Sequence, residues 1–237
     1  MKRILFCKIL NLKVCISIHS GEFNNFINKN EQKKTFYKTT LCWADSIVFM
    51  NASECFRFSS LLTEKKAIKV TWASPYLQKK IDAYYCNKVK FYRIASIGML
   101  QSLYGYDILI KVCSEICKEK QIFVKLEILV PEYNVDLDYL RKIEKLINNS
   151  KTEYLDISVI WNRTEIISYL KNIDLFVRYT NTDSFGLSVA EALNCGTPSI
   201  ATNVCTRPKS AILVSPENDK SLKSAILECK ENYDLKE

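Results

Sequence analysis

The chain has 237 residues, 48% of them hydrophobic and 25% charged, which is the composition of a folded globular protein and excludes a disordered one. Lys and Arg (34) outnumber Asp and Glu (26), giving a net charge of +8 that favours anionic ligands or an anionic membrane surface. The lysines are scattered along the chain instead of forming one block, so nucleic acid is not an expected partner.

The ten cysteines and the single histidine limit the metal chemistry available. The cysteines stand singly in apolar surroundings, as at Cys15, Cys42, Cys113 and Cys195, and none forms a Cys-x-x-Cys pair. That spacing does not predict a zinc site. We interpret the cysteines as reduced core residues of a cytoplasmic protein.

The start of the chain, MKRILFCKILNLKVCISI, is similar to a signal peptide in its basic opening and the apolar residues that follow. Lys8 and Lys13 interrupt its apolar run, however, and no small-residue cleavage site precedes the strand-like end. No apolar stretch is as long as the about 18 residues that a membrane-spanning helix needs. We therefore expect a cytoplasmic protein whose membrane contact, at the inner face, would be peripheral.

The first third of the chain predicts few regular elements. They are strands at 14–18 and 46–50, a helix at 53–63, a strand at 69–72, a turn at Ser74 and Pro75, and a connector at 77–90. With so few strands to cover its apolar runs, this part is expected to leave an open sheet edge or to need a partner.

From residue 91 onward, strand and helix patterns alternate regularly. Strands are expected at 91–97, 122–130, 155–160, 173–178, 198–202 and 211–214, and helices at 106–118, 136–148, 164–171, 185–194 and 219–232. Such alternation predicts an α/β fold with a doubly wound parallel sheet and helices on both faces. Ligands bind at the carboxyl ends of such strands, so the loops after residues 97, 130, 160, 178 and 202 should share one edge.

The stretch TNTDSFGLSVAEALNCGTPSIATNV (180–204) carries one acid before a predicted helix and a second acid inside it. The free N–H groups at the start of a helix bind anions. Asp183 could simply cap this helix, and Glu191 could simply be solvated. Alternatively, the helix rises about 9 Å from residue 185 to 191, so the two acids could hold the two ends of a nucleotide sugar.

The segment from Asp183 to Thr202, DSFGLSVAEALNCGTPSIAT, resembles the acid-x7-acid signature of the GT-B retaining glycosyltransferases of family 4. Weaker similarities occur at ILVSPEND (212–219), at Ile97 and Gly98, and at YGYDIL (104–109). Together the similar segments lie between residues 91 and 232.

This resemblance implies roles for individual residues. Glu191 would bind the donor ribose, and Asp183 the hydroxyls of the sugar. The glycine loop at Gly98 and the segment after Asp183 would bind the sugar and diphosphate, the latter through Ser184, Phe185, Gly186 and Leu187. His19, which follows the strand at 14–18, would face the donor sugar and orient the reactants without acting as a base.

Three positions depart from the family pattern. Asp183 replaces the usual Glu, which shortens the reach of the carboxylate. Met99 and Tyr104 stand where the family has an Arg and a Lys that neutralise the diphosphate. Arg178 and Arg207, near the ends of two predicted strands, could supply the missing charge or could be ordinary surface or loop residues.

The resemblance implies two domains of GT-B type: a partial acceptor-side domain at 1–85, truncated relative to the family, and a Rossmann-like donor domain at 86–237. The expected activity is retaining, metal-independent transfer of a hexose from a nucleoside diphosphate sugar to a glycan or glycolipid acceptor in surface polysaccharide synthesis, with no other cofactor.

Other interpretations remain open at this point. The chain could be an inactive remnant, or a nucleotide-sugar binding module completed by a partner chain or by a second copy of itself. A different doubly wound nucleotide-binding domain is a weaker alternative, because the Gly-x-Gly-x-x-Gly turn of dinucleotide sites is absent.

Overall fold

The computed structural model describes residues 2–18, 35, 40–49, 67–69 and 91–234. The chain divides into two compact units, Met1–Ala73 with Thr182–Phe185, and Ser74–Asn181 with Gly186–Glu237. Each unit has its own parallel sheet. The domain boundary predicted between residues 85 and 86 falls outside the described residues and stays a prediction.

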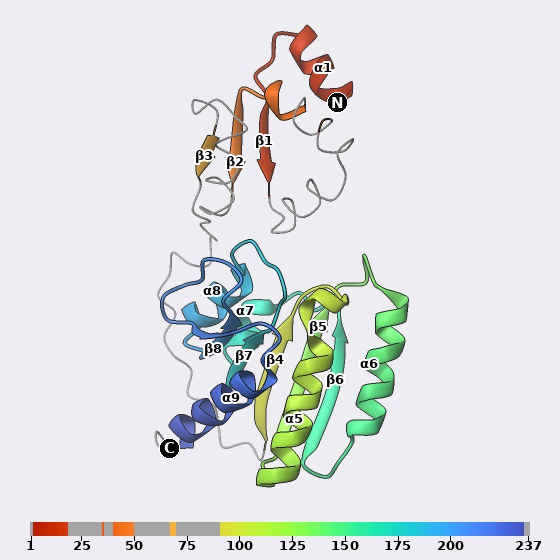
Figure 1. Cartoon of the computed structure of the whole chain (residues 1–237), viewed down its shortest axis with the longest axis vertical. Helices are drawn as coiled ribbons and strands as arrows, with labels where there is room; N and C mark the ends of the chain where they lie inside the picture. Colours follow the sequence, from red (N-terminus) through yellow and green to blue (C-terminus); the bar gives the residue numbers. More distant parts are fainter. Residues whose placement is uncertain (1, 19–34, 36–39, 50–66, 70–90, 235–237) are drawn as a thin grey trace. The chain divides into compact units, whose positions relative to one another are not determined.

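The first unit contains a helix and a parallel sheet in the order β1-β2-β3. Its elements are α1 (Lys2–Ile9), β1 (Cys15–Ile18), β2 (Ser46–Phe49) and β3 (Ala67–Lys69) (Figure 1). The first two strands were predicted to within one residue, whereas α1 was not predicted and β3 begins two residues before the predicted strand. The helix expected at 53–63 lies outside the described residues.

One carboxylate connects α1 to the strands. Asp45 Oδ2 accepts hydrogen bonds from Lys8 Nζ and from the backbone N–H of Val14, both at 2.6 Å. In β2, Ile47 and Phe49 are fully buried. This small sheet therefore has an apolar core, although its described strands are only three or four residues long.

The second unit is the doubly wound sheet that the sequence predicted. Its six strands are parallel, in the order β6-β5-β4-β7-β8-β9. The strands are β4 (Tyr92–Ile97), β5 (Val124–Val130), β6 (Leu155–Trp161), β7 (Leu175–Arg178), β8 (Ser199–Thr202) and β9 (Ile212–Val214). The helices are η3 (Ser102–Tyr104), α5 (Tyr106–Lys120), α6 (Leu137–Ser150), α7 (Ile166–Leu170), α8 (Leu187–Asn194) and α9 (Asp219–Asp234).

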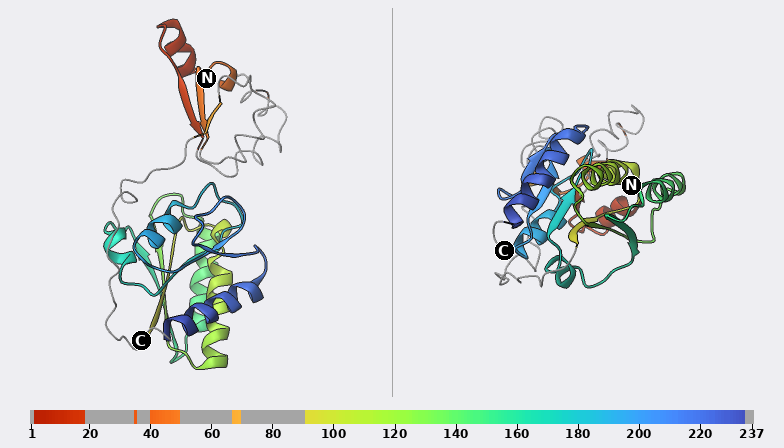
Figure 2. Two further views of the ribbon diagram at one scale, coloured as in Figure 1. Left: turned by 90° about the vertical axis from the view of Figure 1, so that its left-hand side faces the viewer. Right: turned by 90° about the horizontal axis from the view of Figure 1, so that it is seen from below.

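Helices cover both faces of this sheet (Figure 2). Helices α5, α6 and α9 bury one apolar cluster against it, and α7 and α8 bury a second cluster on the opposite face. Strand β5 contributes to both clusters, because successive side chains of a strand point to opposite faces of the sheet. Leu126 and Ile128 belong to the first cluster and Leu129 to the second. Burial on both faces explains why the strands are so apolar.

Helix α8 begins at Leu187, two residues later than predicted. Its N-cap is Gly186, whose φ of +74° lies in the left-handed region that favours glycine. Asp183 is therefore not the capping residue of this helix, so that interpretation was wrong. Helix α7 is also shorter than the predicted span of 164–171.

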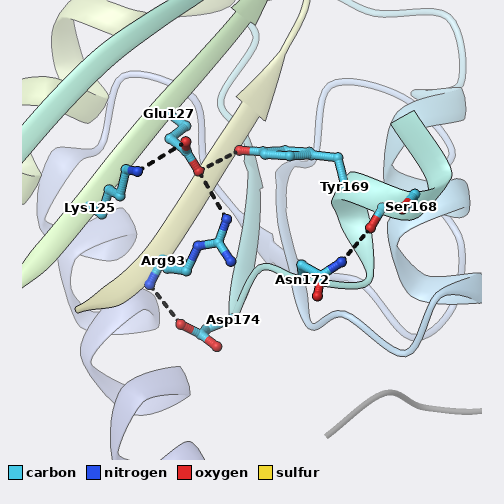
Figure 3. A network of polar contacts seen from close by, with 7 residues as sticks. All are labelled: Arg93, Lys125, Glu127, Ser168, Tyr169, Asn172 and Asp174. Carbon is cyan, nitrogen blue, oxygen red and sulfur yellow. Dashed lines mark hydrogen bonds and ion pairs between the residues drawn. The ribbon is translucent and has the colours of Figure 1, made fainter. Parts of the chain in front are cut away.

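A buried carboxylate ties α7 to the sheet (Figure 3). Glu127 Oε2 accepts a hydrogen bond from the Tyr169 hydroxyl at 3.0 Å and from Arg93 Nη2 at 3.5 Å. Lys125 Nζ lies 3.5 Å from the other carboxylate oxygen. Two cations and a hydroxyl thus surround the Glu127 side chain, which is only 6% exposed, and such partners offset the cost of burying a polar group.

The eight cysteines in the described part of the chain are free thiols. Cys113 and Cys195 are buried, as expected of core residues, but Cys15 and Cys42 are exposed, so the core interpretation was wrong for these two. Burial raises the pKa of Cys117 and of Cys229 to about 11. None of the described helices is long and apolar enough to cross a membrane.

Candidate functional site at the carboxyl edge of the sheet

The parallel strands of the second unit end at one edge, where a cavity of about 300 Å³ opens. Its apolar wall comes from the ends of β4 and β5 and from α7, through Ile97, Leu129, Val130 and Ile166. Loop residues add polar groups, among them Tyr133, Asn162 and Arg163. The volume is at the lower end of the roughly 300–1,000 Å³ typical of small-molecule pockets.

The loop after β4 packs its aromatic residues against a glycine. A Cβ on Gly98 would overlap the Tyr104 ring and would lie 2.9 Å from the Tyr106 hydroxyl oxygen. The Tyr104 ring also stacks on the Tyr106 ring, with centroids 5.8 Å apart and an interplanar angle of 13°. Gly98 and Tyr104 both line the cavity, so this loop forms one of its walls.

Gly105, at the end of the same loop, needs a glycine for two reasons. Its φ is +63°, and a Cβ there would overlap the backbone oxygen of Tyr179. The loop thereby packs against the chain segment that follows β7. The hydroxyl of Tyr106, the next residue, is buried without a hydrogen-bond partner among the described residues. Burial raises the pKa of Tyr106 well above its usual value, although Arg178 nearby opposes this.

Arg178, the last residue of β7, lies between the β4 loop and α8. Its Nη1 donates a hydrogen bond to the backbone oxygen of Ile97 at 2.9 Å and contacts Ser188 Oγ at 3.5 Å. Its guanidinium carbon lies 5.2 Å from the centre of the Tyr104 ring. A cation therefore lies beside Tyr104, the position that holds a lysine in the sequence pattern this chain resembles.

The acid-x7-acid stretch passes through the start of α8. Asp183 Oδ1 accepts a hydrogen bond from the N–H of Ser184 at 2.9 Å. The backbone N–H groups of Leu187 and Ser188 have no acceptor within the described part of the chain, as expected for the first turn of a helix. Glu191 lies in the second turn and is partly buried.

Arg207 is a buried residue and not an ordinary surface or loop arginine. It is 8% exposed, and its Nε donates to the backbone oxygen of Thr202 at 3.0 Å. Its Nη2 contacts the hydroxyls of Thr180 at 3.2 Å and of Thr202 at 3.4 Å. These contacts join the ends of β7 and β8.

The structure thus brings Gly98, Arg178 and the start of α8 to one edge of the sheet. His19 lies outside the described residues, so its predicted role stays a prediction. No group of three or more His, Cys, Asp or Glu side chains that could hold a metal ion occurs among the residues that the structure describes.

Tyr133, Asn162 and Arg163 were not singled out from the sequence, although the loops that carry them were expected at this edge. Their local sequence contains no motif. The available signal was their position, because each follows within three residues the end of a strand that points to the site.

Two of three comparisons with known proteins found similarities. A family model described as "Glycosyl transferases group 1" matches residues 79–237, about two thirds of the chain. No curated protein sequence matches.

Solved structures with the same fold were found. Staphylococcus aureus TarM, in a mutant form with UDP and α-GlcNAc-glycerol, superposes with a TM-score of 0.71 at 16% identity, over 94% of this chain and 46% of TarM. Anabaena HepE with UDP and glucose gives a TM-score of 0.74 at 14% identity, over 98% of this chain and 66% of HepE.

A glycosyltransferase of Rickettsia africae gives a TM-score of 0.69 at 15% identity, over 96% of this chain and 69% of that protein. At these identities the similarity shows the fold, and it confirms the predicted GT-B type. The chain spans less than half the length of TarM and just under two thirds of HepE.

Proposed function

The chain belongs to the group 1 glycosyl transferase family, and on that basis we propose that it transfers a sugar from a nucleoside diphosphate sugar to a glycan or glycolipid acceptor. One observation carries this proposal. The acid-x7-acid stretch of the family begins α8 at the same edge of the sheet as the Gly98 loop and the cavity. Those three features are what a donor nucleotide sugar needs: anion-binding amides, hydroxyl-binding acids and a pocket for the base.

The donor is proposed to lie along this edge. The base enters the cavity, the diphosphate meets the N–H groups of Leu187 and Ser188, and Glu191 accepts hydrogen bonds from the ribose hydroxyls. The helix rises about 6 Å from residue 187 to 191, less than the 9 Å expected from the longer predicted helix. Asp183, in the loop before Gly186, is proposed to hold the sugar hydroxyls, with Ser184 and Phe185 beside it.

Arg178 is proposed to replace the cations that the family carries at the positions of Met99 and Tyr104. It is partly buried at the edge and next to the first turn of α8, where a diphosphate would be stabilised by its charge. Arg207 suits the role less well, because its contacts with Thr180 and Thr202 turn it inward. We assign Arg207 to holding the two strand ends together.

The finer details of the proposal follow the family resemblance. Transfer would retain the anomeric configuration, because the leaving phosphate can take the acceptor proton on the same face. His19 would orient the reactants, and neither a metal ion nor another cofactor would be required. Synthesis of surface polysaccharide at the cytoplasmic face of the membrane, with the chain itself in the cytoplasm, is the proposed setting.

A second candidate is a nucleotide-sugar binding module without turnover, completed by a partner chain or a second copy. The observation that favours it is the β4 loop, in which the Tyr104 ring covers Gly98 and leaves no lysine to stabilise the leaving group. The absence of a lysine at position 104 would reduce catalysis more than it would reduce binding of the donor.

Two measurements test these candidates. Calorimetric titration with UDP, GDP and ADP asks whether the donor site works, and HepE and TarM, whose structures contain UDP, make UDP the first nucleotide to try. Release of UDP from UDP-glucose, with and without candidate glycan acceptors, then asks whether sugar is transferred. Binding with acceptor-dependent release supports the enzyme, binding alone supports the module, and a folded chain that binds no nucleotide contradicts both.

A further inference from the structure

Tyr133 is an exposed aromatic residue at the mouth of an apolar cavity. Its side chain lines the cavity, yet the residue is 63% exposed. No ring, cation or hydrogen-bond partner contacts it within the described part of the chain. A single exposed ring is by itself ordinary, but this one lines a cavity, where an aromatic face can stack on a flat ligand.

The loop that carries Tyr133 is held on both sides. The N–H of Glu132 donates to Asn162 Oδ1 at 2.9 Å, which fastens the loop to the end of β6. On the other side, Gln101 Nε2 donates to the backbone oxygen of Asn134 at 3.0 Å. Tyr133 therefore lies between two anchored residues, so its backbone is positioned before any ligand arrives.

The second aromatic residue of the cavity is already engaged. The Tyr104 ring stacks on Tyr106 and lies under Arg178. Arg163 also lines the cavity, but its guanidinium carbon lies 4.4 Å from the centre of the Tyr169 ring. Tyr133 is thus the lining aromatic group whose π-face is available to a ligand.

We propose that the Tyr133 ring stacks on the nucleobase of the donor and closes the cavity over it. This inference rests on the proposed function, which places the base in this cavity. The cavity lining also includes Ile97, Leu129 and Ile166, and these apolar side chains suit a flat ring. Because every base has a π-face, stacking strengthens binding without selecting one base.

The experiment compares Tyr133→Ala and Tyr133→Phe with the unmodified chain by titration calorimetry, using UDP and, as a probe without a base, pyrophosphate. Stacking predicts that Tyr133→Ala weakens UDP binding by roughly 5- to 100-fold. Tyr133→Phe should bind UDP within about twofold of the unmodified chain, because the ring and not the hydroxyl makes the contact. Pyrophosphate affinity should be the same in all three.

Leu137→Ala is the matched control. Leu137 begins α6, is also 63% exposed and does not line the cavity, so its truncation should leave UDP affinity unchanged. Equal UDP affinity in Tyr133→Ala and the unmodified chain would overturn the stacking while leaving the proposed function intact. If the unmodified chain bound no nucleotide, both proposals would fall. Parallel loss of UDP and pyrophosphate in Tyr133→Ala would also contradict stacking.

Discussion

The guanidinium of Arg178 lies over the Tyr104 ring, with 5.2 Å between the guanidinium carbon and the ring centre. If this cation neutralises the diphosphate, Arg178→Ala should weaken UDP binding by about 1.5–3 kcal/mol, the usual value of a hydrogen bond to a charged group. Titration calorimetry with UDP and with uridine measures the effect, and only UDP should be affected. Equal losses for both ligands would indicate damage to the site as a whole.

Two further variants sharpen the test of Arg178. Arg141→Ala removes the same charge from the exposed surface of α6, where Arg141 pairs with Asp138 at 2.9 Å, and should leave UDP affinity unchanged. Tyr104→Lys restores the cation of the family pattern. In the Tyr104→Lys background, Arg178→Ala should reduce UDP affinity by less, because the introduced lysine would also neutralise the diphosphate.

Glu191 provides the second prediction. Its replacement by Ala should reduce UDP affinity by about 1–3 kcal/mol, because the ribose hydroxyls lose a charged acceptor. The unmodified chain should also bind 2′-deoxy-UDP more weakly than UDP. In Glu191→Ala that difference should shrink, since the partner of the hydroxyl has gone. An undiminished preference for UDP would exclude contact between Glu191 and the 2′ hydroxyl.

The alternation of strands and helices in the second unit, and hence its parallel sheet, could be predicted because each strand and helix has its own periodicity. The limits of the helices were less predictable. Helix α8 starts late because Gly186 adopts a left-handed conformation, which the apolar pattern around Phe185 does not reveal. Helix α1 was not predicted, because its basic start and apolar run have the pattern of a signal peptide.

The candidate site shows a similar division. Gly98, Asp183 and Glu191 lie in recognisable motifs, so the sequence was enough to nominate them as candidates, and their roles stay predictions. Tyr133 and Asn162 are 29 residues apart and come together only because β5 and β6 pair in parallel and end at one edge. Contacts of this kind depend on strand register, which a single sequence does not define.

The buried Glu127 leads to a prediction about stability. Tyr169→Phe removes a hydrogen bond to this carboxylate and should lower the free energy of unfolding by about 1.5–3 kcal/mol. Burial, together with the negative charge of Glu127, raises the pKa of Tyr169, so the hydroxyl stays a donor at neutral pH. Urea unfolding measures the change. Tyr133→Phe, which removes an exposed hydroxyl, should unfold like the unmodified chain, and equal effects in the two variants would show that the Glu127 contact adds nothing.

Asp107 is expected to make the free energy of unfolding depend on pH in the acid range. Burial alone would raise its pKa, but hydrogen bonds from Lys142 at 2.6 Å and from the Tyr139 hydroxyl at 3.0 Å outweigh burial and lower it. A carboxylate whose pKa is lower in the folded state adds stability above its unfolded pKa of about 3.9, and this is lost as the pH falls through the folded value.

Asp107→Asn should therefore lower the free energy of unfolding by about 1–2 kcal/mol at pH 7, an amount reduced by the partial exposure of Lys142. The difference from the unmodified chain should shrink as the pH falls below about 4, because the unfolded chain then binds a proton at Asp107 before the folded carboxylate does. Urea unfolding at pH 7, 5 and 3 follows this change. Asp138→Asn removes a carboxylate that is 92% exposed, and its effect should stay small at every pH. A constant Asp107→Asn penalty down to pH 3 would mean that geometry, and not charge, makes Asp107 stabilising.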